Sequence, residues 1–172
     1  MAVHLLKPQD LYRSRSFMLT PFMGDTGTEI VMQMLGTTVT TRDLPQTYDL
    51  LKHQFPAVLS TKCFNEAHLP FYQEVRNTEI GHLLEHVLLE HLYQEKSSQG
   101  HKNVVFNGRT FWDWHKDPIG SFRIMIDVGL PDLSIFKSCL KRAIDLTERV
   151  LQSNRTITPQ NYLHSHQFPS AR

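Results

Sequence analysis

The 172-residue chain has few cysteines, no long hydrophobic run and no excess of either charge. Cys63 and Cys139 form no Cys-x-x-Cys pair, so we expect two buried, reduced thiols rather than a disulfide framework. No apolar run reaches the roughly 18 residues of a membrane-spanning helix, and the N-terminal MAVHLLKPQD is too short for a signal peptide. The balance of 18 basic and 17 acidic residues favours neither nucleic acid nor an anionic membrane as a partner. We therefore expect a cytoplasmic protein.

The remaining composition is that of a folded domain. Hydrophobic residues make up 40% of the chain and charged residues 20%, and the length allows one substantial core. We expect a single domain over residues 1–152 and a polar tail at 153–172. Ten histidines are many for this length. Two of them, His164 and His166, fall in the tail, where we expect solvated side chains.

The order of the expected elements indicates a mixed α/β (α+β) fold with a small sheet. Strands are predicted at 103–106 and 122–128, and 16–22 is predicted to be a short strand or an edge segment that Pro21 ends. Residues 28–35 have no clear period, so both helix and strand stay open there. Helices are predicted at 42–55, 69–76 (a short helix or a turn), 77–96 and 132–153, with Asp43 capping the first and Asn77 or Thr78 the third.

Ionisable groups interrupt the third predicted helix, whose other positions are mainly apolar. At 100° per residue, His82, Glu85 and His86 lie on the side opposite Ile80 and Leu84. Because the helix is apolar nearly all round, it is predicted to be buried. Buried imidazoles beside a carboxylate cost free energy unless they are hydrogen-bonded or ligate a cation. The alternative is a surface helix with incidental histidines.

The spacing of these groups predicts a metal site. His82 and His86 are four residues apart, so both rings can reach one zinc ion at about 2.0–2.1 Å. Glu85 between them completes a His-x-x-Glu-His pattern, in which a carboxylate that is not a ligand takes a proton from water. Short patterns of this kind also arise by chance. We expect one zinc ion per chain.

A catalytic zinc site needs a third protein ligand, and two carboxylates are candidates. Glu90 lies about 12 Å along the helix axis from His82 and has rotated off its face, so it is better placed to orient His86 or to pair locally. Asp127 belongs to the predicted strand 122–128, where it points opposite to Ile124 and Ile126, and it is the preferred third ligand. Its alternative role is that of a polar residue at the strand end, before Gly129.

The segment from about Leu50 to Leu151 resembles the N-terminal domain of cyanophycin synthetase. The resemblance rests on these features in order: Gly81-His82-Leu83-Leu84-Glu85-His86 with Glu90, Gly108-Arg109-Thr110, the strand Ile124-Met125-Ile126-Asp127, and a long helix from Asp132. Asp127 stands where the family has Glu, and residues 1–45 align poorly. The family's two ATP-dependent ligase domains have no counterpart in this sequence, which therefore looks like a free-standing version of the domain.

The resemblance implies a zinc-dependent peptidase that hydrolyses the aspartate backbone of cyanophycin, an Asp/Arg polymer, into shorter soluble fragments. His82 and His86 would be metal ligands and Glu85 the general base. Arg109 would stabilise the oxyanion or hold a carboxylate, and its alternative is a structural turn residue. Trp112 and Trp114 would stack on substrate guanidinium groups, unless they are half-buried packing residues.

Two other functions remain open at this stage. One is a non-catalytic module that binds cyanophycin or acts as a scaffold, and the other is a metallopeptidase of different specificity. Glu85 favours catalysis, because binding alone gives no reason for a carboxylate beside the metal ligands. The sequence leaves homo-oligomerisation and the choice between endo and exo cleavage undecided.

Overall fold

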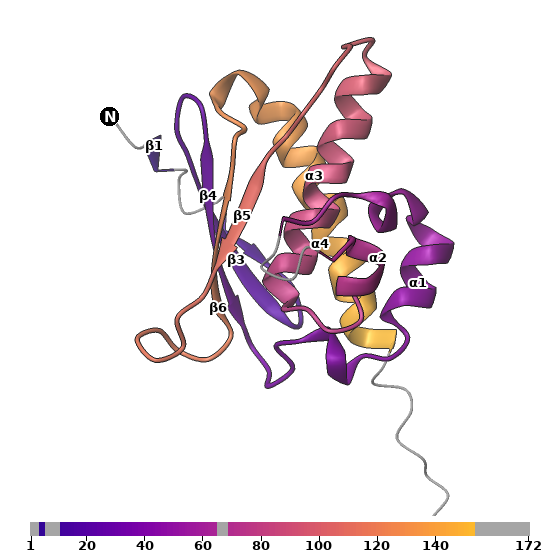
Figure 1. Ribbon diagram of the computed structural model, residues 1–172. Coiled ribbons are helices and arrows are strands. Elements are labelled where there is room, and N and C mark those ends of the chain that lie inside the picture. Colours follow the sequence, from indigo (N-terminus) through magenta and orange to yellow (C-terminus); the bar gives the residue numbers. More distant parts are fainter. Residues whose placement is uncertain (1–3, 6–10, 65–68, 154–172) are drawn as a thin grey trace, which may run out of the picture.

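The computed structural model describes residues 4–5, 11–64 and 69–153, in which helices cover one face of an antiparallel sheet (Figure 1). This arrangement confirms the expected mixed α+β class. The strands are β1 His4–Leu5, β2 Tyr12–Arg13, β3 Phe17–Met23, β4 Thr28–Met34, β5 Gly108–Phe111 and β6 Ser121–Ile126. The α-helices are α1 Thr47–Gln54, α2 Phe71–Glu74, α3 Ile80–Ser98 and α4 Leu133–Ser153. None of the described helices is both long and apolar enough to cross a membrane. The predicted tail lies outside the described residues, apart from Ser153 at the end of α4.

The sheet has the order β1-β3-β4-β6-β5, and β2 also pairs with β3. All of its pairings are antiparallel. Burial alternates along β3, β4 and β6, so one face of the sheet is apolar and packs against the helices. The same alternation settles residues 28–34 as a strand, β4.

Pro21 does not end its strand, because β3 continues to Met23. Proline has no backbone N–H to donate. It is therefore tolerated in a strand at a position where no neighbouring strand would accept that hydrogen bond. On one side of β3, β2 pairs with residues 18–19 and β1 pairs with residues 22–23, so Pro21 falls between them. Its other neighbour is Ile30 of β4.

The predictions for residues 103–106 and for Asp43 are also wrong. Residues 103–106 form no strand, and β5 begins only at Gly108, after Asn103 adopts a left-handed backbone with φ 57°. Asp43 does not cap α1, whose N-cap is Gln46. Asp43 belongs to a separate 3-10 turn, Thr41–Asp43, because Pro45 disfavours helical geometry at the residue before it.

Helix α3 runs through the middle of the molecule. It contacts α4, strands β5 and β6, and the 3-10 turn Pro56–Ser60, so it is enclosed on several sides. The expected burial of this helix is confirmed. Its fully buried apolar side chains are Ile80, Leu83, Leu84, Val87, Leu88 and Leu92. Its N-cap is Glu79, rather than the predicted Asn77 or Thr78, and makes no side-chain capping bond.

Candidate metal centre

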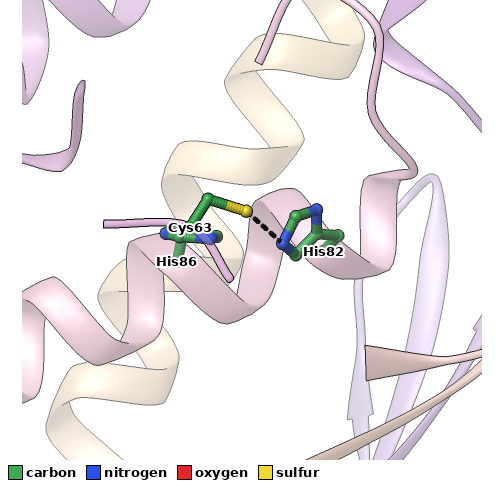
Figure 2. A group of neighbouring side chains, drawn as sticks. All are labelled: Cys63, His82 and His86. Carbon is green, nitrogen blue, oxygen red and sulfur yellow. Dashed lines mark hydrogen bonds between the residues drawn. The ribbon is translucent and has the colours of Figure 1, made fainter. Parts of the chain in front are cut away.

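Two imidazoles and one thiol meet beside the first turns of α3 (Figure 2). His82 and His86 project from successive turns of the helix, and Cys63 comes from the segment that follows the 3-10 turn Pro56–Ser60. The Sγ atom of Cys63 lies 3.5 Å from Nε2 of His82. One ligand atom from each of the three residues lies within 4.8 Å of the other two. Three potential metal ligands are therefore gathered at one point.

The donor set and spacing fit zinc. Thiolate and imidazole are the ligands that structural and catalytic zinc sites use most, at about 2.3 Å for sulfur and about 2.0–2.1 Å for nitrogen. With tetrahedral angles, these bond lengths place sulfur and nitrogen about 3.6 Å apart. The distance between Cys63 and His82 is 3.5 Å, close to this value. A buried Cys/His/His cluster that could hold a metal ion is thus present, as the predicted cofactor requires.

Each imidazole forms a hydrogen bond through Nδ1 with a threonine hydroxyl. Thr78 Oγ1 lies 2.7 Å from Nδ1 of His82, and Thr61 Oγ1 lies 2.9 Å from Nδ1 of His86. Thr61 donates its own proton to the carbonyl oxygen of Val58, so it accepts from His86. His86 therefore carries its hydrogen on Nδ1 and a lone pair on Nε2. This is the tautomer that an Nε2 ligand needs.

The cluster is packed against an aromatic ring and is nearly closed to solvent. Phe71 of α2 stacks on His86 with ring centroids 3.8 Å apart and meets His82 edge-on. Burial lowers the pKa of His82 to about 4. Burial and then the charge of His82 lower the pKa of His86 to about 3. Both imidazoles are therefore neutral at pH 7, which is the form that binds metal.

Glu85 lies on the same helix but faces strand β5. Thr110 Oγ1 donates to its carboxylate at 2.5 Å, and a Cβ added at Gly108 would lie only 2.8 Å from Oε1. Burial raises the pKa of Glu85 to about 7, and the hydrogen bond from Thr110 opposes this shift. Glu85 is about 60° around the helix from His82 and about 100° from His86. Its side chain thus projects from a neighbouring face of α3 towards β5, and its carboxylate is not among the ligand atoms gathered within 4.8 Å.

The two carboxylates that were candidates for the third ligand, Asp127 and Glu90, form hydrogen bonds with other residues. The carboxylate of Asp127 accepts two hydrogen bonds from Asn107, both of 2.8 Å, and is exposed. Residues alternate along β6, so Asp127 points to the side opposite Ile126, which faces the helices. Glu90 accepts a hydrogen bond of 2.8 Å from Gln94, a local pairing. Cys63 therefore occupies the place in the cluster where the sequence predicted Asp127.

Arg109 is not brought next to Glu85. It is exposed, and its guanidinium lies 5.6 Å from the centre of the Phe111 ring, which is also exposed. Gly108 and Thr110 face Glu85, so alternation directs Arg109 to the opposite face of the sheet.

Trp112 and Trp114 pack around Phe122. Their ring centroids lie 6.3 Å and 5.7 Å from that of Phe122, in edge-to-face arrangements. Trp114 also donates its indole N–H to the carbonyl oxygen of Ser121 at 3.0 Å. Trp112 is 42% exposed and keeps an open face, whereas Trp114 is half-buried. Both rings contribute to packing at this edge of the molecule.

Sequence reasoning missed Cys63. The residue lies 19 positions before His82, in an irregular segment, and no short pattern links it to the helix. The sequence offered one indirect indication that Cys63 could be a ligand: cysteine is a common zinc ligand, and the chain was already predicted to bind zinc through two histidines.

No known protein family, no curated protein and no solved structure matches this chain.

Proposed function

We propose that the protein is a zinc-dependent hydrolase that cleaves amide bonds, with Cys63, His82 and His86 as the metal ligands. The observation that carries this proposal is the gathering of three ligand atoms within 4.8 Å, with a sulfur–nitrogen distance suited to tetrahedral zinc. Among the described residues the cluster offers three ligands, which would leave the fourth tetrahedral position free. Open positions are typical of catalytic zinc sites.

Zinc would supply a Lewis acid that polarises a carbonyl group and acidifies water. The protein's own side chains have separate tasks in this scheme. Thr61 and Thr78 fix the orientation of the two imidazoles. Glu85 is the general base, because it is a buried carboxylate on the same stretch of α3 as both histidines and it keeps a hydrogen bond from Thr110. Phe71 excludes water from one side of His86.

The proposed substrate is cyanophycin or a similar Asp/Arg polymer. Support comes from the resemblance of the helix around His82, the Gly108-Arg109-Thr110 segment and the following elements to the N-terminal domain of cyanophycin synthetase. The exposed face of Trp112 offers a surface on which a substrate guanidinium could stack. Side chains alternate along β5, so Arg109 lies on the face of the sheet opposite Glu85. Its proposed role is to contact parts of a long polymer that are distant from the bond being cleaved.

One observation favours a second candidate, a zinc-stabilised module that binds the polymer without cleaving it. Glu85 is hydrogen-bonded to Thr110 and lies against Gly108, so its carboxylate is directed to β5. In this candidate, Glu85 ties α3 to β5 and has no chemical task. Metal content would be the same in both cases, and only turnover separates them.

The test combines metal analysis with a hydrolysis assay. Protein purified without chelators should contain about one zinc per chain. It should also release soluble fragments from insoluble cyanophycin, identified by mass, while poly-aspartate and casein stay largely intact. Comparable rates on all three polymers would indicate a peptidase of other specificity. Zinc binding with polymer retention but no fragments would favour the binding module, and protein without transition metal would reject both candidates.

A further inference from the structure

A third histidine of α3, His91, is buried without any hydrogen bond. Only 9% of its surface is exposed, and neither ring nitrogen has a partner among the described residues. Its ring stacks on Phe55, with centroids 4.1 Å apart. A buried imidazole with two unpaired nitrogens costs free energy that an apolar residue would avoid. The proposed metal centre makes no use of this side chain.

His91 forms part of the wall of a cavity of about 190 Å³ between α1, α3 and α4. Phe55, His91 and Leu146 are its buried lining residues, and the others are exposed polar residues: Gln54, Arg142, Asp145 and Arg149. Pockets for drug-sized ligands are larger, about 300–1,000 Å³. The size therefore suits a group of a few atoms that enters from solvent.

Two arginines, Arg142 and Arg149, bring positive charge to the cavity beside His91. Burial, and then the charges of Arg142 and Arg149, lower the pKa of His91 to about 4. Arg142 also donates to Glu95 at 2.9 Å and to Cys139 Sγ at 3.1 Å, so its charge is partly compensated. Arg149 has no ion pair among the described residues. A cation would be repelled at this position, whereas an anion would be attracted.

We propose that this cavity binds a small oxyanion, a phosphate-type or carboxylate group, through His91, Arg142 and Arg149. Arginine N–H groups match oxyanions in geometry as well as charge, and an imidazole N–H adds one donor at the cavity floor. Asp145 at the rim opposes a second anion, so the site takes one group at a time. The proposal is independent of the zinc site.

Binding should be linked to proton uptake. An anion beside His91 favours the charged imidazolium, so it raises a pKa that is low in the free protein. The groups that face His91 are Arg142, Arg149 and Asp145 from α4, with Glu95 acting through Arg142. An imidazole of ordinary pKa changes charge between pH 5 and 8. Affinity should therefore rise as the pH falls through this range.

Sulfate and acetate are suitable probes because neither changes charge between pH 6 and 8. Each is titrated calorimetrically into the full-length, zinc-loaded protein at low ionic strength, with sodium chloride as the control for screening. We expect a dissociation constant below about 1 mM for at least one probe, together with a shift of the His91 ring resonances in NMR spectra. Tighter sulfate binding would indicate a phosphate-type ligand, and tighter acetate binding a carboxylate.

Two variants and one control decide the outcome. His91→Phe keeps the stacking on Phe55 but removes both nitrogens, and Arg149→Gln removes the second guanidinium of the cavity wall. Each should weaken binding at least about tenfold, with zinc content unchanged. Arg123→Gln, on the exposed face of the sheet beside Glu29, should bind like the wild type. Absence of binding by both probes, or equal affinity in all three variants, would overturn the proposal.

Discussion

The hydroxyl of Thr61 accepts a hydrogen bond from Nδ1 of His86, at 2.9 Å, because it donates its own proton to the backbone. The acceptor of that proton is the carbonyl oxygen of Val58, 2.7 Å away, in the 3-10 turn that leads towards Cys63. One short segment thus provides both a proposed ligand and the group that orients another ligand. This segment therefore determines the position of Cys63 and, through Thr61, the orientation of His86.

Thr61→Val should weaken zinc binding without unfolding the protein. Valine keeps the shape but cannot accept the hydrogen bond, so His86 loses its fixed tautomer. Loss of such an outer contact costs typically 10–100-fold in metal affinity. Competition with a calibrated chelator measures this change. Thr37→Val, at an exposed position in the segment that follows β4, should retain wild-type affinity, and equal losses in both variants would contradict the role given to Thr61.

The identity of the third ligand can be tested by comparing Cys63→Ser with Asp127→Asn. Serine is a poor zinc ligand at neutral pH, so Cys63→Ser should lose most of its bound zinc. Asp127→Asn should keep its zinc, because that carboxylate is occupied by Asn107. Zinc content per chain after gel filtration distinguishes the two. The reverse order would return Asp127 to the ligand role predicted from the sequence.

The sequence was sufficient to predict which side chains share one side of the buried helix α3. The spacing of His82 and His86 placed both rings on one side of α3, and the apolar surround predicted its burial. These inferences depend only on helix geometry and on contacts within about one turn. The class of fold could be predicted for the same reason. Local hydrophobic periodicity indicates whether a segment is a helix or a strand, and the order of these segments along the chain indicates an α+β fold.

The rest of the site depends on contacts that no local period encodes. Cys63 reaches His82 only because the segment after α1 folds back over α3, and the sequence gives no spacing rule for that path. Asp127 was predicted as a ligand because it points opposite Ile126. The helices, however, cover the Ile126 face of the sheet, so this orientation leads away from the cluster. A choice between the two faces requires knowledge of the packing.

Gly81→Ala should destabilise the protein although alanine is the better helix former. A Cβ at this position would lie 2.6 Å from Cγ of Phe122, which is fully buried and has no room to retreat. Overpacking of this kind costs about 1–3 kcal/mol, more than the roughly 1 kcal/mol gained in helix propensity. Urea unfolding measures the difference. Gly36→Ala, with no atom within 4 Å of the added methyl, should change stability by less than about 0.5 kcal/mol.

The stability of the protein should fall in acid partly because of His91. Its pKa is about 4 in the folded state and about 6.5 when unfolded, so between these values the unfolded chain binds more protons. This contribution is present above pH 6.5 and is lost as the pH falls towards 4. His91→Phe should therefore lose less stability than the wild type between pH 7 and pH 5, measured by urea unfolding in buffers without oxyanions. Equal losses would mean that His91 is not buried in its neutral form.

Glu85→Gln separates the enzyme from the binding module. Glutamine keeps the shape and can still accept the hydrogen bond from Thr110, so the variant should fold and keep its zinc. It cannot take a proton from water. Loss of a general base lowers turnover by typically 10²–10⁴-fold, which release of soluble fragments from cyanophycin would record.

The matched control is Glu90→Gln on the same helix, where the carboxylate bonds only Gln94 among the described residues. This variant should release fragments at the wild-type rate, so a loss confined to position 85 cannot come from removing a negative charge from α3. Zinc content and polymer binding are measured for both variants. If Glu85→Gln retains full activity, the carboxylate serves only to join α3 to β5 through Thr110. The proposal of an enzyme then loses its general base, and the zinc-stabilised binding module becomes the better account of the site.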